Sequence, residues 1–316
     1  MPGNRLTVEF DGVSRELTTH PQISGESFQH PDDRDASQTL QHIPFFPELF
    51  KLINGSYFDQ RVRMERLTNN LRLGPNQGAK LHSSFVQAAQ ILDVPVLPEL
   101  YLSNYPMIDS YSSGLNQPSV TLSQGCLTML SDAEIFALIG HELGHLKCQH
   151  GVNKALAAIV GSIGASGIAS ALPVVGGAAV YGITAGLTHW SRMAEFSGDR
   201  AALLVVQDPL VVANVIAKMS GFHKGVLSDF NFESLFQQLE DYDRYDQNAL
   251  QSLVKLQKMV LDSLGQAWLP SPILRIKRIL MWGSSDQYKD IMSGTYTRVP
   301  PSTPHPELQL PVQSTG

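Results

Sequence analysis

The sequence contains few cysteines and no basic cluster, and each absence excludes a class of protein. Only two cysteines, Cys126 and Cys148, occur in 316 residues, which is too few for a disulfide framework. We therefore expect two free thiols. The net charge is −6 and no run of Lys or Arg stands out, so a nucleic-acid partner is not expected.

The N-terminus also lacks an apolar stretch. Arg5, Glu9 and Asp11 stand where a secretory signal peptide would have its hydrophobic region. We accordingly expect no secretory signal and a reducing, cytoplasmic setting. By contrast, 43% of the residues are hydrophobic, which is sufficient for a globular chain with a core.

The residue pattern predicts a mainly helical α+β chain with a short sheet. Apolar residues recur at helical spacing in residues 43–71 and 79–92. Two short segments, 99–102 and 119–122, are typical of strands. Residues 248–282 again have helical character, which two prolines interrupt.

Composition divides the chain into three regions. Residues 1–40 are polar and rich in turn-forming residues, and apart from a short strand at 5–10 we expect a loosely ordered leader. Residues 41–285 are expected to form the main domain. Residues 286–316 are predicted to be a Pro- and Ser-rich tail.

The clearest predicted helix extends from Ser131 to Gly151. Ser131 and Glu134 have the spacing of a capping box, in which the serine accepts from a free backbone N–H and the glutamate reaches back to the cap. Gly151 is suited to the left-handed conformation just past a helix end. The sequence therefore predicts both ends of this helix.

Within this helix, His141-Glu-Leu-Gly-His145 matches the HExxH pattern of metalloproteases. Residues four apart lie on the same helix face, so both imidazoles can bind one zinc ion. Glu142 lies beside the first histidine, where its carboxylate can take a proton from the attacking water as a general base. The alternative is a surface helix that holds two histidines by chance, and the capped, largely apolar helix argues against it.

A catalytic zinc site needs a third protein ligand. The best candidate is Glu195, in a predicted helix at 188–206, with Asp199 one turn further on. A histidine that binds a metal usually donates its other N–H to a carboxylate, and Asp199 can fill that role. The alternative is a solvated helix face on which both carboxylates pair with Arg192 and Arg200.

These residues resemble the HtpX-like zinc metallopeptidases, the family that includes the CAAX prenyl endopeptidase. The resemblance extends over about a third of the chain, and its matching residues are His141-Glu-Leu-Gly-His145, Lys147, His150, Arg192, Glu195, Asp199 and Arg200, with Pro98-Glu-Leu-Tyr101 and Val120-Thr-Leu-Ser-Gln-Gly125 upstream.

The resemblance implies a zincin-like fold with one zinc per chain. His141, His145 and Glu195 would bind the zinc, and Asp199 would support a ligand from behind. It also implies that an extended substrate pairs with an edge strand near residues 108–111, as exposed strand edges permit.

One position departs from the family pattern, which often has a His-Pro pair and an Arg six residues after the His that faces the developing oxyanion. Here Leu269-Pro270 is followed by Arg275, so the proline and arginine align and the histidine is absent. The resemblance implies a catalytic role for Arg275, whereas the alternative is an ordinary basic residue near Lys277 and Arg278. Loss of an oxyanion donor typically costs about two to three powers of ten in turnover.

Residues 155–188 contain no Asp, Glu, Lys or Arg. His145 and Glu195 must meet at one zinc, whereas a single membrane span would separate its ends by about 30 Å. Pro173 divides the segment into two parts that are each short for a span of about 20 residues. The sequence therefore predicts a helical hairpin, and two alternatives stay open: a hairpin buried on the core and one that contacts a membrane.

We thus expect a zinc-dependent endopeptidase that acts on peptides or unfolded proteins, in the cytoplasm or at the cytoplasmic face of a membrane, where protein quality control is one role. A zinc-binding scaffold with little catalysis is the alternative. Glu142 favours the enzyme, because a scaffold has no use for a base beside the metal. The absent histidine before Pro270 slightly favours the scaffold.

Overall fold

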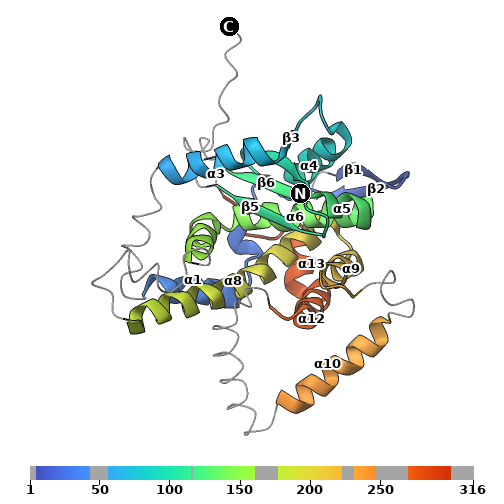
Figure 1. Cartoon of the computed structure of the whole chain (residues 1–316). Helices are drawn as coiled ribbons and strands as arrows, with labels where there is room; N and C mark the ends of the chain where they lie inside the picture. Colours follow the sequence, from blue (N-terminus) through green and yellow to red (C-terminus); the bar gives the residue numbers. More distant parts are fainter. Residues whose placement is uncertain are drawn as a thin grey trace.

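The computed structural model describes residues 5–42, 56–114, 117–160, 177–222, 231–246 and 270–299. These residues form mainly helices, together with a four-stranded sheet and a separate two-stranded hairpin (Figure 1). The predicted mainly helical α+β class is therefore confirmed.

The larger sheet has the strand order β3-β4-β6-β5. Its strands are β3 (Leu71–Leu73), β4 (Glu99–Ser103), β5 (Ser110–Ser113) and β6 (Ser119–Ser123). The inner pair β4 and β6 is parallel and confirms two predicted strands, while the outer pairs are antiparallel. The sequence pattern does not predict β3, which has three residues, or β5, whose Ser-Tyr-Ser-Ser sequence lacks apolar alternation.

Most of the other described residues are helical. The helices are α1 (Pro31–Gln41), α3 (Ser56–Asn69), α4 (Ala79–Ile91), α5 (Gln124–Met129), α6 (Asp132–Lys147), α8 (Gly177–Val206), α9 (Pro209–Met219), α10 (Phe232–Asp246), α12 (Pro272–Gly283) and α13 (Asp286–Met292), with a 3₁₀ turn η1 (Gly25–Ser27). Residues 151–160 are also helical. Helix α4 confirms the prediction for 79–92, whereas α8 begins earlier than predicted. The predictions for 43–71 and 248–282 fall partly outside the described residues.

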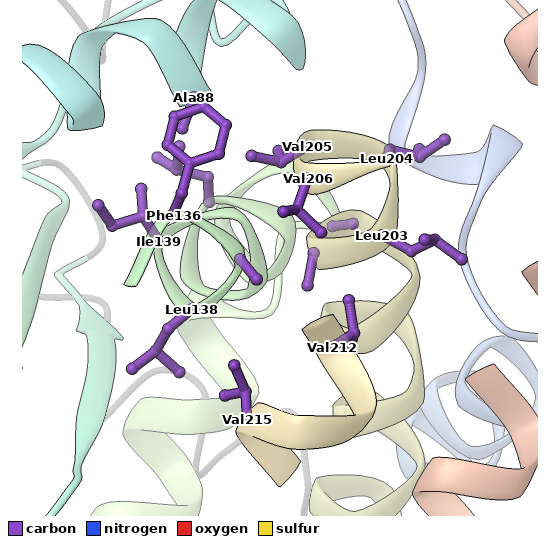
Figure 2. Close-up of a cluster of buried hydrophobic side chains, with 14 of the residues drawn as sticks. Ala88, Phe136, Leu138, Ile139, Leu203, Leu204, Val205, Val206, Val212 and Val215 are labelled. Carbon is purple, nitrogen blue, oxygen red and sulfur yellow. The ribbon is translucent and has the colours of Figure 1, made fainter. Parts of the chain in front are cut away.

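Helix α6 is buried over most of its length and packs closely against α8. A methyl group added at Gly140 would collide with Val205, and one added at Gly144 would collide with Ala201. Figure 2 shows the apolar side chains that fill the core around this contact, including Phe136. The two glycines therefore allow the HExxH turn of α6 to lie directly beside α8.

The start of α6 is the predicted one, and its end differs. The backbone N–H of Glu134 donates to Ser131 Oγ at 3.3 Å, and the Ser131 N–H donates to Glu134 Oε2 at 2.8 Å, which completes the capping box. Beyond the helix, Gln149 has a φ of 58° and adopts the left-handed conformation. Gly151 does not cap this helix, because the chain is already helical again from residue 151.

The predicted leader, residues 1–40, is described from residue 5, and apart from the strand at 5–10 the prediction that it is loosely ordered is wrong for these residues. The predicted strand is confirmed as β1 (Arg5–Phe10), which pairs with β2 (Val13–Thr18), and helix α1 follows. Phe10 packs edge-on against Phe136 of α6 at 5.1 Å between ring centroids, and Phe28 is fully buried. This segment is polar on average, but most of its apolar side chains are buried.

The predicted tail also begins too early. Residues 286–292 form α13, whose Ile291 is buried in the main core, and Arg298 forms a β-bridge with Ile23. The boundaries predicted at residues 40 and 285 therefore do not coincide with the limits of the core. Residues 300–316 lie outside the described residues.

The middle of the uncharged segment, residues 161–176 with Pro173, lies outside the described residues. The described parts on either side are helical. They contribute to a second apolar cluster, which also includes part of α1 and consists of Ala36, Leu40, Ala155, Leu156, Val160, Ile183, Leu187, Trp190 and Ala194. None of the described helices has both the length and the hydropathy of a membrane span. Membrane contact stays a prediction, which co-sedimentation with liposomes would test.

Candidate metal centre and catalytic site

The two histidines of the HExxH pattern lie side by side on α6. Their Nε2 atoms are 3.0 Å apart, and both side chains are buried. The helical spacing of four residues thus turns both rings toward one point, as predicted from the sequence. Burial lowers the pKa of His145 to about 3, so its ring is neutral and can offer a lone pair to a cation.

Glu195 of α8 faces the same point. Its Oε2 lies 3.4 Å from His141 Nε2, and its Oε1 lies 3.5 Å from His145 Nε2. Tetrahedral zinc with ligand distances of about 2.0–2.1 Å places its ligand atoms about 3.3 Å apart. The separation of the two Nε2 atoms and the distance from each to its nearer Glu195 oxygen are close to this value. Within the described part of the chain, these residues form the one group of His, Cys, Asp or Glu close enough to hold a metal ion.

The charges around His141 are those that a cation requires. Burial lowers the pKa of His141, but the hydrogen bonds and charges of Asp199 and Glu195 outweigh burial and raise this pKa to about 9. Asp199 Oδ1 lies 3.2 Å from His141 Nδ1, where it accepts a hydrogen bond from the ring nitrogen that points away from the centre. A methyl group at Gly198 would collide with the His141 ring. This glycine therefore lets both carboxylates of α8 reach the histidine.

Arg275 of α12 lies behind these carboxylates. Its Nε and Nη2 donate to the two oxygens of Asp199 at 2.9 and 2.6 Å, and its Nη1 lies 3.3 Å from Glu195 Oε2. Burial alone would raise the pKa of each carboxyl, but the guanidinium charge outweighs it and lowers the pKa of both. The interpretation of Glu195 and Asp199 as a solvated helix face is therefore wrong. All three guanidinium nitrogens of Arg275 face carboxylates.

The far side of His145 has a different arrangement. His145 Nδ1 lies 2.9 Å from Nδ1 of His150, and His150 Nε2 lies 2.9 Å from Asp33 Oδ2 in α1. The sequence indicates His150 only through the family resemblance, and it does not indicate Asp33, which falls in the predicted leader. No local spacing relates Asp33 to the HExxH pattern, because the contact depends on how α1 packs on α8.

Glu142 faces the sheet side of α6. Ser110 Oγ of β5 donates to Glu142 Oε1 at 2.7 Å, and Lys154 Nζ lies 3.5 Å from Glu142 Oε2. Burial raises the pKa of Glu142, but the charges of Lys154 and His141 outweigh burial, and the pKa is about 2. Glu142 is therefore ionised at neutral pH and able to accept a proton. Neither Ser110 nor Lys154 is predicted by the sequence pattern.

Strand β5 is the edge of the larger sheet beside α6. It pairs with β6 on one side, with Ser110 opposite Leu122. The resemblance implies a substrate-binding edge near residues 108–111, and the edge strand itself covers Ser110–Ser113. An extended peptide that added to this edge would lie next to Glu142.

Comparison with known proteins gives a family for most of the chain. Residues 75–281 match the sequence model of peptidase family M48. The plastoglobule-localized metallopeptidase 48 of Arabidopsis thaliana chloroplasts is 31% identical over 85% of this chain and 76% of its own length. A protease HtpX homolog of Moorella thermoacetica is 26% identical over 52% of this chain and 62% of its own length. A protease HtpX homolog 2 of Methanosarcina mazei is 24% identical over 59% of this chain and 70% of its own length. No solved structure matches the chain.

Proposed function

Because this chain belongs to peptidase family M48 and is a metallopeptidase, we propose that it is a zinc-dependent endopeptidase whose ligands are His141, His145 and Glu195. The observation that carries the proposal is the convergence of the three side chains. The two Nε2 atoms lie 3.0 Å apart, and each lies 3.4 or 3.5 Å from one carboxylate oxygen of Glu195, which is about the spacing between ligands of one zinc ion. Zinc, when bound there, supplies Lewis acidity that polarises the scissile carbonyl and makes water easier to deprotonate.

Glu142 is the general base in this proposal. Its ionised carboxylate accepts the proton of the water that attacks the scissile carbonyl, and it then passes that proton to the leaving amine. Ser110 holds one oxygen in place at 2.7 Å, which leaves the other oxygen, beside Lys154, to exchange the proton. The charge of Lys154 keeps the carboxylate ionised before the reaction.

Arg275 and Asp199 hold the ligands. The guanidinium neutralises the two carboxylates and fixes their orientation, and Asp199 fixes the ring of His141. This assigns Arg275 a positioning role in place of the oxyanion role that the resemblance implies, because its nitrogens are already paired. The oxyanion donor is not assigned.

The substrate class proposed is an extended peptide or an unfolded protein. Pairing with a strand edge uses backbone groups that every peptide has, so it selects an extended conformation more than a particular sequence. The Arabidopsis relative is named as plastoglobule-localized. A cytoplasmic location for this chain remains a prediction from sequence.

The proposal is tested by digestion of an unfolded protein with the full chain, followed by mass spectrometry of the products. We expect internal fragments, loss of cleavage on chelation, and recovery on addition of zinc. Elemental analysis should give one zinc per chain, and Glu195→Ala should lose most of it, because two histidines alone hold zinc poorly. Full zinc occupancy of Glu195→Ala would show that the third ligand is misassigned, and trimming only from chain ends would contradict an endopeptidase.

A further inference from the structure

The hydrogen bonds behind His145 allow only one arrangement of protons if its Nε2 is to bind a metal. That nitrogen must then carry no proton, so His145 Nδ1 is protonated and donates to His150 Nδ1 at 2.9 Å. His150 Nδ1 must therefore accept, which leaves its proton on Nε2. This Nε2 donates in turn to Asp33 Oδ2 at 2.9 Å.

We propose that Asp33, acting through His150, is a positioning residue that fixes the tautomer and orientation of His145 as a metal ligand. The inference rests on the proposed zinc site, and it adds helix α1 and the N-terminal segment to the machinery of that site. A metal-binding histidine usually has a carboxylate or carbonyl directly behind it. In this chain the carboxylate behind His145 is displaced by the width of one imidazole ring.

Asp33 is held as a carboxylate by several donors. Ser197 Oγ donates to Asp33 Oδ2 at 2.6 Å and Gln29 Nε2 donates to the same oxygen at 3.0 Å. Burial raises its pKa, but these hydrogen bonds and the contact with His150 outweigh burial, and the pKa is about 2. Asp33 is completely buried. An ionised acceptor in such a site is a strong partner for the His150 N–H.

His150 is equally constrained. The left-handed Gln149 turns the chain back at the end of α6, and the His150 backbone N–H donates to the His145 carbonyl at 3.0 Å. The ring of Trp190 packs edge-on against it at 5.4 Å between centroids, and Trp190 Nε1 donates to Ser37 of α1 at 2.9 Å. The ring of His150 is thus fixed between α6, α8 and α1.

A buried pair of Asp33 and His150 could also serve stability alone, and metal affinity distinguishes the two roles. The test measures the zinc dissociation constant of the full chain by competition with a chromophoric chelator, for wild type, Asp33→Ala, His150→Phe and the double variant. We expect about 10- to 100-fold weaker binding for each single variant. The double variant should bind zinc no more weakly than the more strongly affected single variant, because both changes break the same hydrogen-bonded path.

Two further measurements make the result specific. Replacement of zinc by Co²⁺ reports ligand geometry, and its visible spectrum should change in both single variants. Glu134→Gln is the matched control, because Glu134 is also buried on α6 but pairs with Lys218 at 2.7 Å. It should lose stability and keep the zinc affinity and Co²⁺ spectrum of wild type. If Asp33→Ala does not fold, Asp33→Asn keeps the shape without the charge, and we expect several-fold weaker zinc binding for it.

The results that would overturn this inference differ from those that would contradict the zinc site itself. Wild-type zinc affinity and an unchanged Co²⁺ spectrum in folded Asp33→Asn and His150→Phe, with affinity lost in Glu195→Ala, would overturn the positioning role alone. Additive losses in the double variant would also overturn it. Absence of stoichiometric zinc in the wild type would instead contradict the proposed function.

Discussion

The two histidines of the site are supported by different parts of the molecule. Behind His141, Asp199 contacts the ring directly at 3.2 Å, and Arg275 of α12 binds that carboxylate with two nitrogens. Behind His145, the carboxylate of Asp33 is reached only through His150. The first carboxylate contacts its histidine directly, whereas the second is separated from its histidine by one more imidazole ring. The comparison indicates that Arg275 and Asp199, the α12 side, set the charge of the site. Asp33 and His150, the α1 side, set the orientation of the His145 ring.

The largest effect should come from the α12 side. Arg275→Met leaves the buried carboxylates of Asp199 and Glu195 without their cation, and breaking a buried pair in this way costs about 3–5 kcal/mol. Urea unfolding of the metal-free protein measures this loss, and zinc affinity should fall as well. A loss of turnover of 100-fold or more at unchanged zinc affinity would contradict the positioning role and show that Arg275 stabilises the oxyanion.

A smaller effect is expected for the direct contact with His141. Asp199→Asn keeps the shape of the side chain and removes the charge that faces the ring, so zinc affinity should fall about 10- to 100-fold. Zinc competition measures this, beside Asp33→Asn as the matched variant on the other side. If Asp33→Asn lost more affinity than Asp199→Asn, the ranking of the two sides would be reversed.

The smallest effect concerns acid stability on the α1 side. The pKa of Asp33 is lowered from 3.8 to about 2, so its contribution is present above about pH 4 and is lost as the pH falls to about 2. The shift corresponds to about 2 kcal/mol. Asp33→Asn should flatten the decrease in unfolding free energy over this interval, measured by urea unfolding at several pH values. An equally steep decrease in the variant would show that other groups cause it.

The sequence predicts the α12 side of the site better than the α1 side. His141 and His145 on α6 are related by helical spacing, and so are Glu195 and Asp199 on α8, so each pair shares a helix face by local geometry. Asp33 is brought to His150 over a separation of 117 residues, and nothing local to either residue indicates the contact. Tertiary packing alone creates it.

The fold shows the same division between local and long-range information. The capping box, α4 and the two inner strands are predicted because their signals lie within a few residues. Apart from the strand at 5–10, the order of the N-terminal residues is not predicted, because it depends on Phe10 and Phe28 entering a core formed by distant segments. Gly151 is likewise a locally reasonable cap, but the chain turns at Gln149 and resumes a helix at that glycine.

The central claim is that Glu142 acts as the general base for hydrolysis at a zinc site, and Glu142→Gln tests this claim most directly. The substitution keeps the size of a side chain that is held by Ser110 at 2.7 Å, and it removes the oxygen that accepts the proton. Turnover of an unfolded protein and zinc content are measured together for wild type and variant. We predict unchanged zinc content and a loss of turnover of about two to four powers of ten. Equal, chelator-insensitive cleavage by both proteins would contradict the account.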